Sequence, residues 1–222
     1  MSKAKIYGIY GASGFGREVL PVARSMLENR GDHRDAFELV FIDDGPTASS
    51  ANGVRTLRYD DFLAMEATAK YVNVAIAAHG VRRKLVERCT QDSLQLFDIA
   101  APNVVVLDAV EVGPGSILCP FVTLTSNIRI GRCFHANIYS YVAHDCVIGD
   151  YVTFAPGVKC NGNIVVEDDV YLGTGAVLKQ GAPGAPLVIG RGAVVGMGAV
   201  VTKSVEPGAT VVGNPARPMV RG

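Results

Sequence analysis

The sequence has no net charge and no long hydrophobic run, and each absence excludes a class of function. It balances 21 Lys and Arg against 21 Asp and Glu over 222 residues, so it lacks the basic surface that nucleic-acid binding requires. No apolar stretch approaches the roughly 20 residues that cross a membrane, and the N-terminus does not have the layout of a signal peptide. We expect a cytoplasmic protein with no membrane span and no nucleic-acid partner.

Cysteine and histidine are too few and too scattered for a metal site. The five cysteines form no CxxC pair and no Cys/His spacing of the kind that binds zinc. Of the four histidines, only His135 and His144 lie in the second half of the chain. This disfavours a zinc-dependent carbonic anhydrase built on a β-helix, which needs three histidines. We therefore expect neither a metal ion nor a disulfide.

An aliphatic or small apolar residue recurs at every sixth position in the second half of the chain. Neither the 3.6-residue period of a helix nor the two-residue period of a flat strand explains this spacing. It is typical of a parallel β-helix, in which each hexad forms one side of a coil. The series is Val112, Leu118, Leu124, Ile130, Ala136, Val142, Ile148, Phe154, Cys160, Val166, Leu172 and Leu178, and it resumes at Ile189, Val195 and Val201.

The hexad pattern resembles that of the hexapeptide-repeat acyltransferases, which implies a left-handed β-helix with three hexads in each coil. The residue after each apolar one is often Gly or Asn, where we expect the turns. The register places Cys146 and Cys160 inward as small hydrophobes. It predicts that Cys119 and Cys133 lie outward and that His135 lies at the surface or at an interface.

The first part of the chain alternates between strand and helix patterns, which predicts a small parallel sheet with helices on its faces. We place this Rossmann-like domain at residues 1–98 and the β-helix at residues 99–222. The basic run Arg82-Arg83-Lys84 is expected on an exposed helix face. The predicted strands are Lys5–Tyr10, Phe37–Ile42 and Tyr71–Ala77, and the later predicted helices are Tyr59–Ala69 and Val81–Cys89.

A glycine-rich turn between the first strand and the first helix predicts a phosphate site. Gly11, Ser13, Gly14 and Gly16 form the turn. Glycine allows close approach of the backbone to a pyrophosphate, and a helix N-terminus offers N–H groups and a positive dipole. Arg17, in the first helical turn, could add a charge-assisted hydrogen bond. A tight turn that binds no ligand would have the same composition.

Two acidic residues favour the nucleotide over an empty turn. Asp43 and Asp44 end the second strand, where an acid commonly binds ribose hydroxyls. The first hundred residues leave no room for the separate catalytic domain of a dehydrogenase or an epimerase. We therefore expect the nucleotide to be a handle on the substrate and not a redox cofactor.

His144 is the leading catalytic candidate. It lies two positions after the inward Val142, so its side chain is expected to point outward, as a solvated surface histidine would also do. Asp145 follows it and could orient the imidazole of a general base. Gly162 lies eighteen residues later, at the same angular position one coil further on, where its N–H could stabilise an oxyanion.

The glycine turn, the FIDD strand end and the HDCVIGD segment together resemble the nucleotide-sugar N-acetyltransferases, over nearly the whole chain. Those enzymes acetylate 4-amino-4,6-dideoxy sugars, as in bacillosamine and perosamine pathways, and sialic acid O-acetyltransferase-like proteins share their layout. The resemblance implies a homotrimer that uses acetyl-CoA, with His144 as general base and Asp145 as its partner. It also implies catalytic roles for Asn137 and Gly162.

The resemblance further implies that acetyl-CoA lies between adjacent subunits, with its adenosine end near the last coils, where Lys203 and Arg217 are the available cations. The chain departs from some relatives at Thr153, where they carry a second histidine, and at His79, where they have a Gly/Asn-rich turn. O-acetylation of a sugar or sialic acid remains an alternative. A non-catalytic trimeric scaffold that binds nucleotide sugars is a second alternative, which the catalytic candidates in register disfavour.

Overall fold

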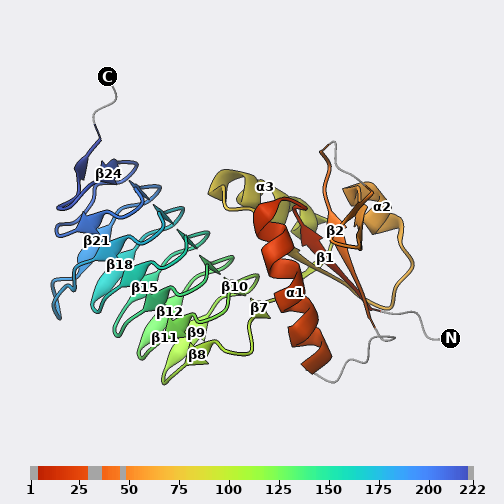
Figure 1. Ribbon diagram of the computed structural model, residues 1–222, viewed down its shortest axis with the longest axis horizontal. Coiled ribbons are helices and arrows are strands. Elements are labelled where there is room, and N and C mark those ends of the chain that lie inside the picture. Colours follow the sequence, from red (N-terminus) through yellow and green to blue (C-terminus); the bar gives the residue numbers. More distant parts are fainter. Residues whose placement is uncertain (1–4, 30–36, 46–48, 220–222) are drawn as a thin grey trace. The chain divides into compact units, whose positions relative to one another are not determined.

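The computed structural model describes residues 5–29, 37–45 and 49–219 and divides into two compact units, 1–102 and 103–222. Figure 1 shows an α/β arrangement in the first unit and stacked coils in the second. The predicted fold class, a Rossmann-like domain followed by a left-handed parallel β-helix of hexapeptide repeats, is confirmed. Within the described ranges, no helix is long and apolar enough to cross a membrane.

The first unit is built on one sheet with the strand order β3-β4-β2-β1-β5-β6. The central strand β1 pairs in parallel with β2 and β5, and only β3 runs antiparallel to its neighbour. The strands of this sheet are β1 (Lys5–Tyr10), β2 (Phe37–Ile42), β3 (Ser50–Ala51), β4 (Val54–Leu57), β5 (Lys70–Val74) and β6 (Gln95–Leu96), and β7 (Ile99–Ala100) follows along the chain outside it. The helices are α1 (Gly14–Asn29), α2 (Tyr59–Ala64) and α3 (His79–Gln91).

The first two predicted strands match β1 and β2 residue for residue, whereas other boundaries differ. The third strand ends at Val74 and α2 ends at Ala64, both earlier than predicted. The expectation of an exposed basic face on α3 is wrong for Arg82, whose side chain is fully buried. Its guanidinium donates to the carbonyl oxygens of Ile76 (2.8 Å) and Ala77 (3.3 Å) in the loop before α3, and these hydrogen bonds compensate for burial of the charged group.

Three sheets form the sides of the β-helix. Sheet one contains β10 (Ile117–Leu118), β13 (His135–Ala136), β16 (Thr153–Phe154), β19 (Tyr171–Leu172), β22 (Val194–Val195), β24 (Thr210–Val212) and β25 (Arg217–Pro218). Sheet two contains β8 (Val105–Val106), β11 (Thr123–Leu124), β14 (Tyr141–Val142), β17 (Lys159–Cys160), β20 (Val177–Leu178) and β23 (Val200–Val201). Sheet three contains β9 (Val110–Val112), β12 (Ile128–Ile130), β15 (Val147–Ile148), β18 (Ile164–Val166) and β21 (Leu187–Ile189).

The register of these sheets makes residues eighteen apart into neighbours. Thr123 pairs with Tyr141, and Tyr141 pairs with Lys159. Every pairing between coils is parallel, and only β25 turns back antiparallel to β24. The predicted period of three hexads per coil therefore describes the structure.

The turns lie two residues later in each hexad than predicted. A left-handed backbone conformation recurs at every sixth position, three residues after each apolar one, for example at Phe121 (φ 65°), Asn127 (φ 57°) and Tyr139 (φ 59°). The glycines directly after the apolar residues serve another purpose. A Cβ on Gly131 would lie 2.8 Å from the backbone nitrogen of Asp150 in the next coil, so glycine there allows the coils to approach.

The inward positions are filled as predicted for Cys146 and Cys160, which are 1% and 0% exposed. The expectations for Cys119, Cys133 and His135 are wrong, because all three are buried. His135 lies on β13 of sheet one, in register between Ile117 and Thr153, whose side chains are also buried. Cys133 lies at a corner of the coil, with a φ of 54°, and Cys119 directly follows β10.

Candidate active site

The glycine turn connects the buried end of β1 to the start of α1. Gly11 has a φ of 105° and donates its N–H to the carbonyl oxygen of Ile42 (2.7 Å). A Cβ on Gly16 would lie 1.8 Å from the carbonyl oxygen of Gly11, so only glycine lets the helix begin so close to the turn. Ser13 and Gly14 are exposed, and nothing lies within 4 Å of a Cβ on Gly14. Two glycines therefore shape the turn, and Gly14 leaves open space in front of it.

Asp43 fixes this turn from the neighbouring strand. Its Oδ2 accepts the N–H of Ala12 (3.0 Å), and its Oδ1 accepts the N–H of Gly45 (2.9 Å). The sequence therefore correctly places this acid beside the turn. Arg17 is exposed on the first turn of α1, and its N–H bonds the carbonyl oxygen of Ser13 (3.0 Å).

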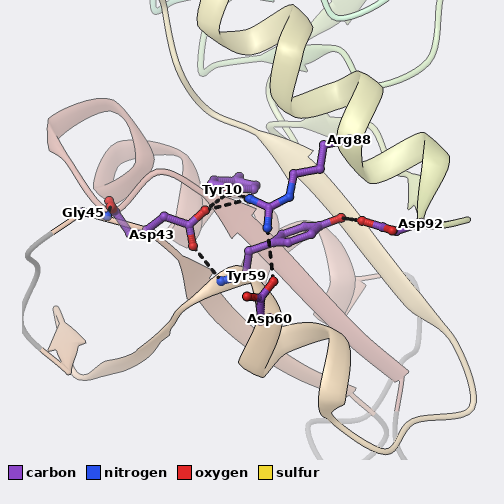
Figure 2. A network of polar contacts seen from close by, with 8 residues as sticks. Tyr10, Asp43, Gly45, Tyr59, Asp60, Arg88 and Asp92 are labelled. Carbon is purple, nitrogen blue, oxygen red and sulfur yellow. Dashed lines mark hydrogen bonds and ion pairs between the residues drawn. The ribbon is translucent and has the colours of Figure 1, made fainter.

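Asp44 instead lies in a network of polar contacts that the sequence did not reveal, and Figure 2 labels its partners Tyr10, Tyr59 and Arg88. Its Oδ1 accepts the N–H of Tyr59 (2.9 Å), and its Oδ2 accepts the hydroxyl of Tyr10 (2.5 Å) and a guanidinium N–H of Arg88 (3.0 Å). Partial burial would raise the pKa of Asp44, but these hydrogen bonds outweigh burial and lower it. A carboxylate offers about four lone-pair sites, so Asp44 has little capacity left for ribose hydroxyls.

Arg88 joins three elements of the first unit through this network. Its second guanidinium nitrogen reaches Asp60 on α2 (3.1 Å), and its guanidinium carbon lies 3.9 Å from the centroid of the Tyr59 ring. The Tyr59 hydroxyl donates to Asp92 (2.7 Å). Burial is the main cause that raises the pKa of both Tyr10 and Tyr59, so both hydroxyls stay protonated and donate. The network holds the ends of β1, β2 and α3 together beside the glycine turn.

His144 lies at the corner between β14 and β15, with its side chain 47% exposed, as the register predicts. Its Nδ1 lies 2.7 Å from Oδ2 of Asp145. An ionised carboxylate only accepts hydrogen bonds, so the proton of the neutral imidazole is on Nδ1 and Nε2 is free to act as a base. The hydrogen bond from His144, followed by one from Asn127, lowers the pKa of Asp145 and keeps it ionised.

Gly162 lies against the imidazole from the next coil. A Cβ on Gly162 would lie 2.4 Å from Cε1 and 2.5 Å from Nε2 of His144, so the absent side chain makes room for the ring. The carbonyl oxygen of Gly162 accepts the N–H of Gly181 (3.0 Å), whereas its own N–H has no acceptor within the described part of the chain. The structure therefore brings a histidine, its acid and an open backbone N–H together at one corner.

Asn137 does not join this group within one chain. It follows β13 at another corner, and its Oδ1 accepts the N–H of Ile138 (2.7 Å). No hydrogen bond between Asn137 and His144 is present among residues 5–29, 37–45 and 49–219. Thr153 is buried in β16, and His79 begins α3.

The two cations near the C-terminus lie together. Lys203 and Arg217 line one pocket of about 280 Å³ beside β23 and β24, with Glu206 also in its wall. Arg217 is exposed and donates to the carbonyl oxygen of Ala216 (2.9 Å). In the described part of the chain no group of three His, Cys, Asp or Glu side chains is arranged to hold a metal ion.

Asn127 is the site residue that sequence reasoning missed. Its Nδ2 donates to Oδ1 of Asp145 (3.2 Å), the oxygen that His144 does not use. The available signal was spacing, because Asn127 precedes Asp145 by one coil of eighteen residues. The same spacing relates His144 to Gly162 in the next coil.

Comparison with known proteins identifies relatives of this chain. Residues 7–89 match the PglD N-terminal domain family. The chain is 51% identical over 216 residues to GDP-perosamine N-acetyltransferase from Escherichia coli O157:H7, covering 97% of both chains. The structure of WeeI from Acinetobacter baumannii AYE superposes with a TM-score of 0.93 at 58% identity, over 97% of this chain and all of the other.

The acetyltransferase domain of PglB from Neisseria gonorrhoeae, solved in complex with acetyl coenzyme A, is more distant. It superposes with a TM-score of 0.85 at 26% identity, over 97% of this chain and 100% of that domain. Similarity to these three proteins therefore extends over both units.

Replacement of Gly162 by Ala tests the contact with the imidazole. The new methyl group would overlap the ring, so we expect it to displace His144 and to lower kcat, up to the about 10²–10⁴-fold that a general base contributes. The half-exposed ring can rotate away, so the melting temperature should change little. Steady-state kinetics and circular dichroism check this, and an unchanged kcat in a folded variant would contradict it.

Proposed function

The chain belongs to the nucleotide-sugar N-acetyltransferases, the family of GDP-perosamine N-acetyltransferase, and we propose that its acceptor is a GDP-linked 4-amino-4,6-dideoxy sugar of the perosamine type. It is an acyltransferase that takes the acetyl group from acetyl-CoA. The choice of carrier and sugar rests on 51% identity over 97% of the chain to an enzyme of that name. The observation that carries the chemistry is the His144–Asp145 pair facing Gly162.

In the proposed mechanism His144 removes a proton from the attacking amine. Attack of a neutral amine on the thioester carbonyl creates an N⁺–H group, which must lose its proton before the intermediate can collapse toward the amide. Nε2 of His144 takes that proton, while Asp145 stabilises the imidazolium through Nδ1. The Gly162 N–H stabilises the oxyanion. The His144 imidazolium gives this proton to the sulfur as the C–S bond breaks, so coenzyme A leaves as the thiol and the base is regenerated. Transfer is direct, with no covalent intermediate on the enzyme.

We assign the two substrates to opposite ends of the chain. The pocket with Lys203 and Arg217 offers two positive charges to the phosphates of coenzyme A. The exposed turn at Ser13 and Gly14, at the N-terminus of α1, offers backbone N–H groups to a pyrophosphate, with Arg17 as a nearby cation. Asp43 keeps the turn in place and retains lone pairs for a ribose.

A homotrimer in the cytoplasm completes the proposal. Tyr139 is 61% exposed, and its ring stacks on that of Phe121, which is 52% exposed, with centroids 4.8 Å apart. Exposed aromatic pairs of this kind favour a protein interface, and such an interface would supply the walls that the half-exposed His144 lacks within one chain. The five cysteines are all free, as is usual where thiols are kept reduced.

The substrate assignment is tested with acetyl-CoA and a panel of GDP-, UDP- and dTDP-linked 4-amino sugars, by measuring release of the free thiol. We expect the GDP-linked sugar to have the highest kcat/KM. Treatment of the product with hydroxylamine distinguishes an amide, which resists it, from an O-acetyl ester. Faster turnover with a UDP-linked sugar would refute the assignment of the carrier.

The catalytic roles predict unequal effects of two substitutions. His144→Ala should lower kcat by about 10²–10⁴-fold with little change in KM, because it removes the base. Asp145→Asn should do less damage, since it leaves the imidazole in place. Both variants should remain folded, because neither side chain is buried. Near wild-type kcat in a folded His144→Ala variant at saturating substrates rules out the mechanism.

Gly14→Val should separate acceptor binding from chemistry. The space around a Cβ at this position is open, so the fold tolerates the side chain, but the side chain occupies the volume that we assign to a phosphate. We expect a raised KM for the nucleotide sugar and an unchanged Kd for acetyl-CoA, by kinetics and calorimetry. An equal loss of acetyl-CoA affinity would mean that the two ligands are assigned to the wrong units.

Light scattering coupled to gel filtration tests the oligomeric state. We expect three times the mass of the 23.4 kDa chain. Tyr139→Glu should weaken the assembly, because it places a charge in the proposed interface. A monomer that retains full activity at assay concentrations would contradict the trimer.

A further inference from the structure

The acid that orients His144 is itself held in place from the preceding coil. Asp145 is half-exposed, so burial does not restrict the rotation of its carboxylate. Its two oxygens have different donors: Nδ1 of His144 on Oδ2 at 2.7 Å and Nδ2 of Asn127 on Oδ1 at 3.2 Å. With one donor on each oxygen the plane of the carboxylate is fixed, and so is the imidazole that bonds to it.

Backbone geometry alone does not explain an asparagine at this position. Asn127 has a φ of 57°, a conformation that Asn and Asp tolerate better than other non-glycine residues. However, the equivalent corner positions on other sides of the coil are occupied by Phe121, Cys133 and Tyr139, with φ between 54° and 65°. The coil therefore accepts many kinds of side chain at its corners. The left-handed backbone does not require asparagine at position 127, so we look to the hydrogen bond of its carboxamide for the reason.

We propose that Asn127 is a positioning residue of the acetyl transfer, acting through Asp145 to direct Nε2 of His144 toward the reacting amine. This inference rests on the proposed function and deepens it. Asn127, Asp145 and His144 then form a chain of hydrogen bonds across two coils. Such chains fix the tautomer and orientation of a catalytic histidine more strictly than the adjacent acid alone.

Binding of the acceptor sugar is a second role that the carboxamide of Asn127 can serve, and kinetics distinguish it from positioning. With Glu111 and Arg129 it lines a polar pocket of about 320 Å³ on the coil before His144. If its carboxamide bound the acceptor sugar there, removing it would raise KM for the acceptor. A positioning residue instead lowers kcat and leaves KM unchanged.

Two substitutions of Asn127 make the test. Asn127→Gly removes the carboxamide but suits the left-handed backbone better than asparagine does. A purely structural role therefore predicts full activity and equal or higher stability, whereas positioning predicts a kcat lower by about tenfold, the loss of one charged hydrogen bond. Asn127→Asp keeps the shape but places a second carboxylate beside Asp145.

The Asp variant has a signature in pH. The Asp145 carboxylate bonds the imidazole at 2.7 Å, and the buried Cys146 thiol donates to the backbone carbonyl oxygen of His144 at 3.6 Å. An added negative charge favours the protonated ring, so the acidic limb of the kcat profile should move to higher pH by about half a unit for charges several ångströms apart in a solvated site. The midpoint of the His144 ring titration by NMR should move in the same direction in the enzyme without substrates.

The outcomes separate cleanly. Wild-type kcat in Asn127→Gly overturns the proposal, as does a raised acceptor KM with unchanged kcat. An unmoved NMR titration in Asn127→Asp also overturns it, and this measurement stands even if the acceptor assigned above is wrong, because it needs no substrate. Lower kcat with unchanged KM and stability in the Gly variant, with the pH shift in the Asp variant, supports it.

Discussion

The distance between successive coils of the β-helix determines both the packing of the coils and the space around His144. Parallel strands hydrogen-bond at about 4.8 Å, and each coil takes eighteen residues. Side chains one coil apart at the same corner must therefore touch, or one of them must be absent. Gly131 has no side chain to collide with the backbone of the next coil, and Gly162 has none to collide with the imidazole of His144. A single spacing produces both the tight core and the open site.

The first unit has a different requirement, because its glycine turn must be held in shape by side chains of the neighbouring strand. Asp43 supports the turn directly, and Asp44 supports the elements beside it through Tyr10 and Arg88. Both carboxylates therefore have a structural role within the first unit. An acid in this sequence position is therefore weaker evidence for a ribose contact than its place at the end of the strand suggests, because the backbone N–H groups nearby need acceptors whether or not a nucleotide is present.

Sequence predicted the features that repeat, and missed those that depend on a single contact. The six-residue period revealed the β-helix, the outward His144 and its juxtaposition with Gly162. It could not reveal that His135 is covered, because a register says which way a side chain points and nothing about what lies over it. The burial of Arg82 was missed for a similar reason. A basic run indicates an exposed helix face, and the sequence does not show that a carbonyl oxygen of the adjoining loop accepts a hydrogen bond from this guanidinium.

The last strand has a consequence for how these molecules behave in concentrated solution. A β-helix ends in open strand edges, which invite the coils of another molecule to add to them. Here β25 folds back antiparallel onto β24, with Pro218 opposite Val211. Proline has no N–H to offer a further strand, so this edge of sheet one cannot continue into a neighbour. The segment that contributes Arg217 to the pocket thus also limits growth of that sheet into a fibre.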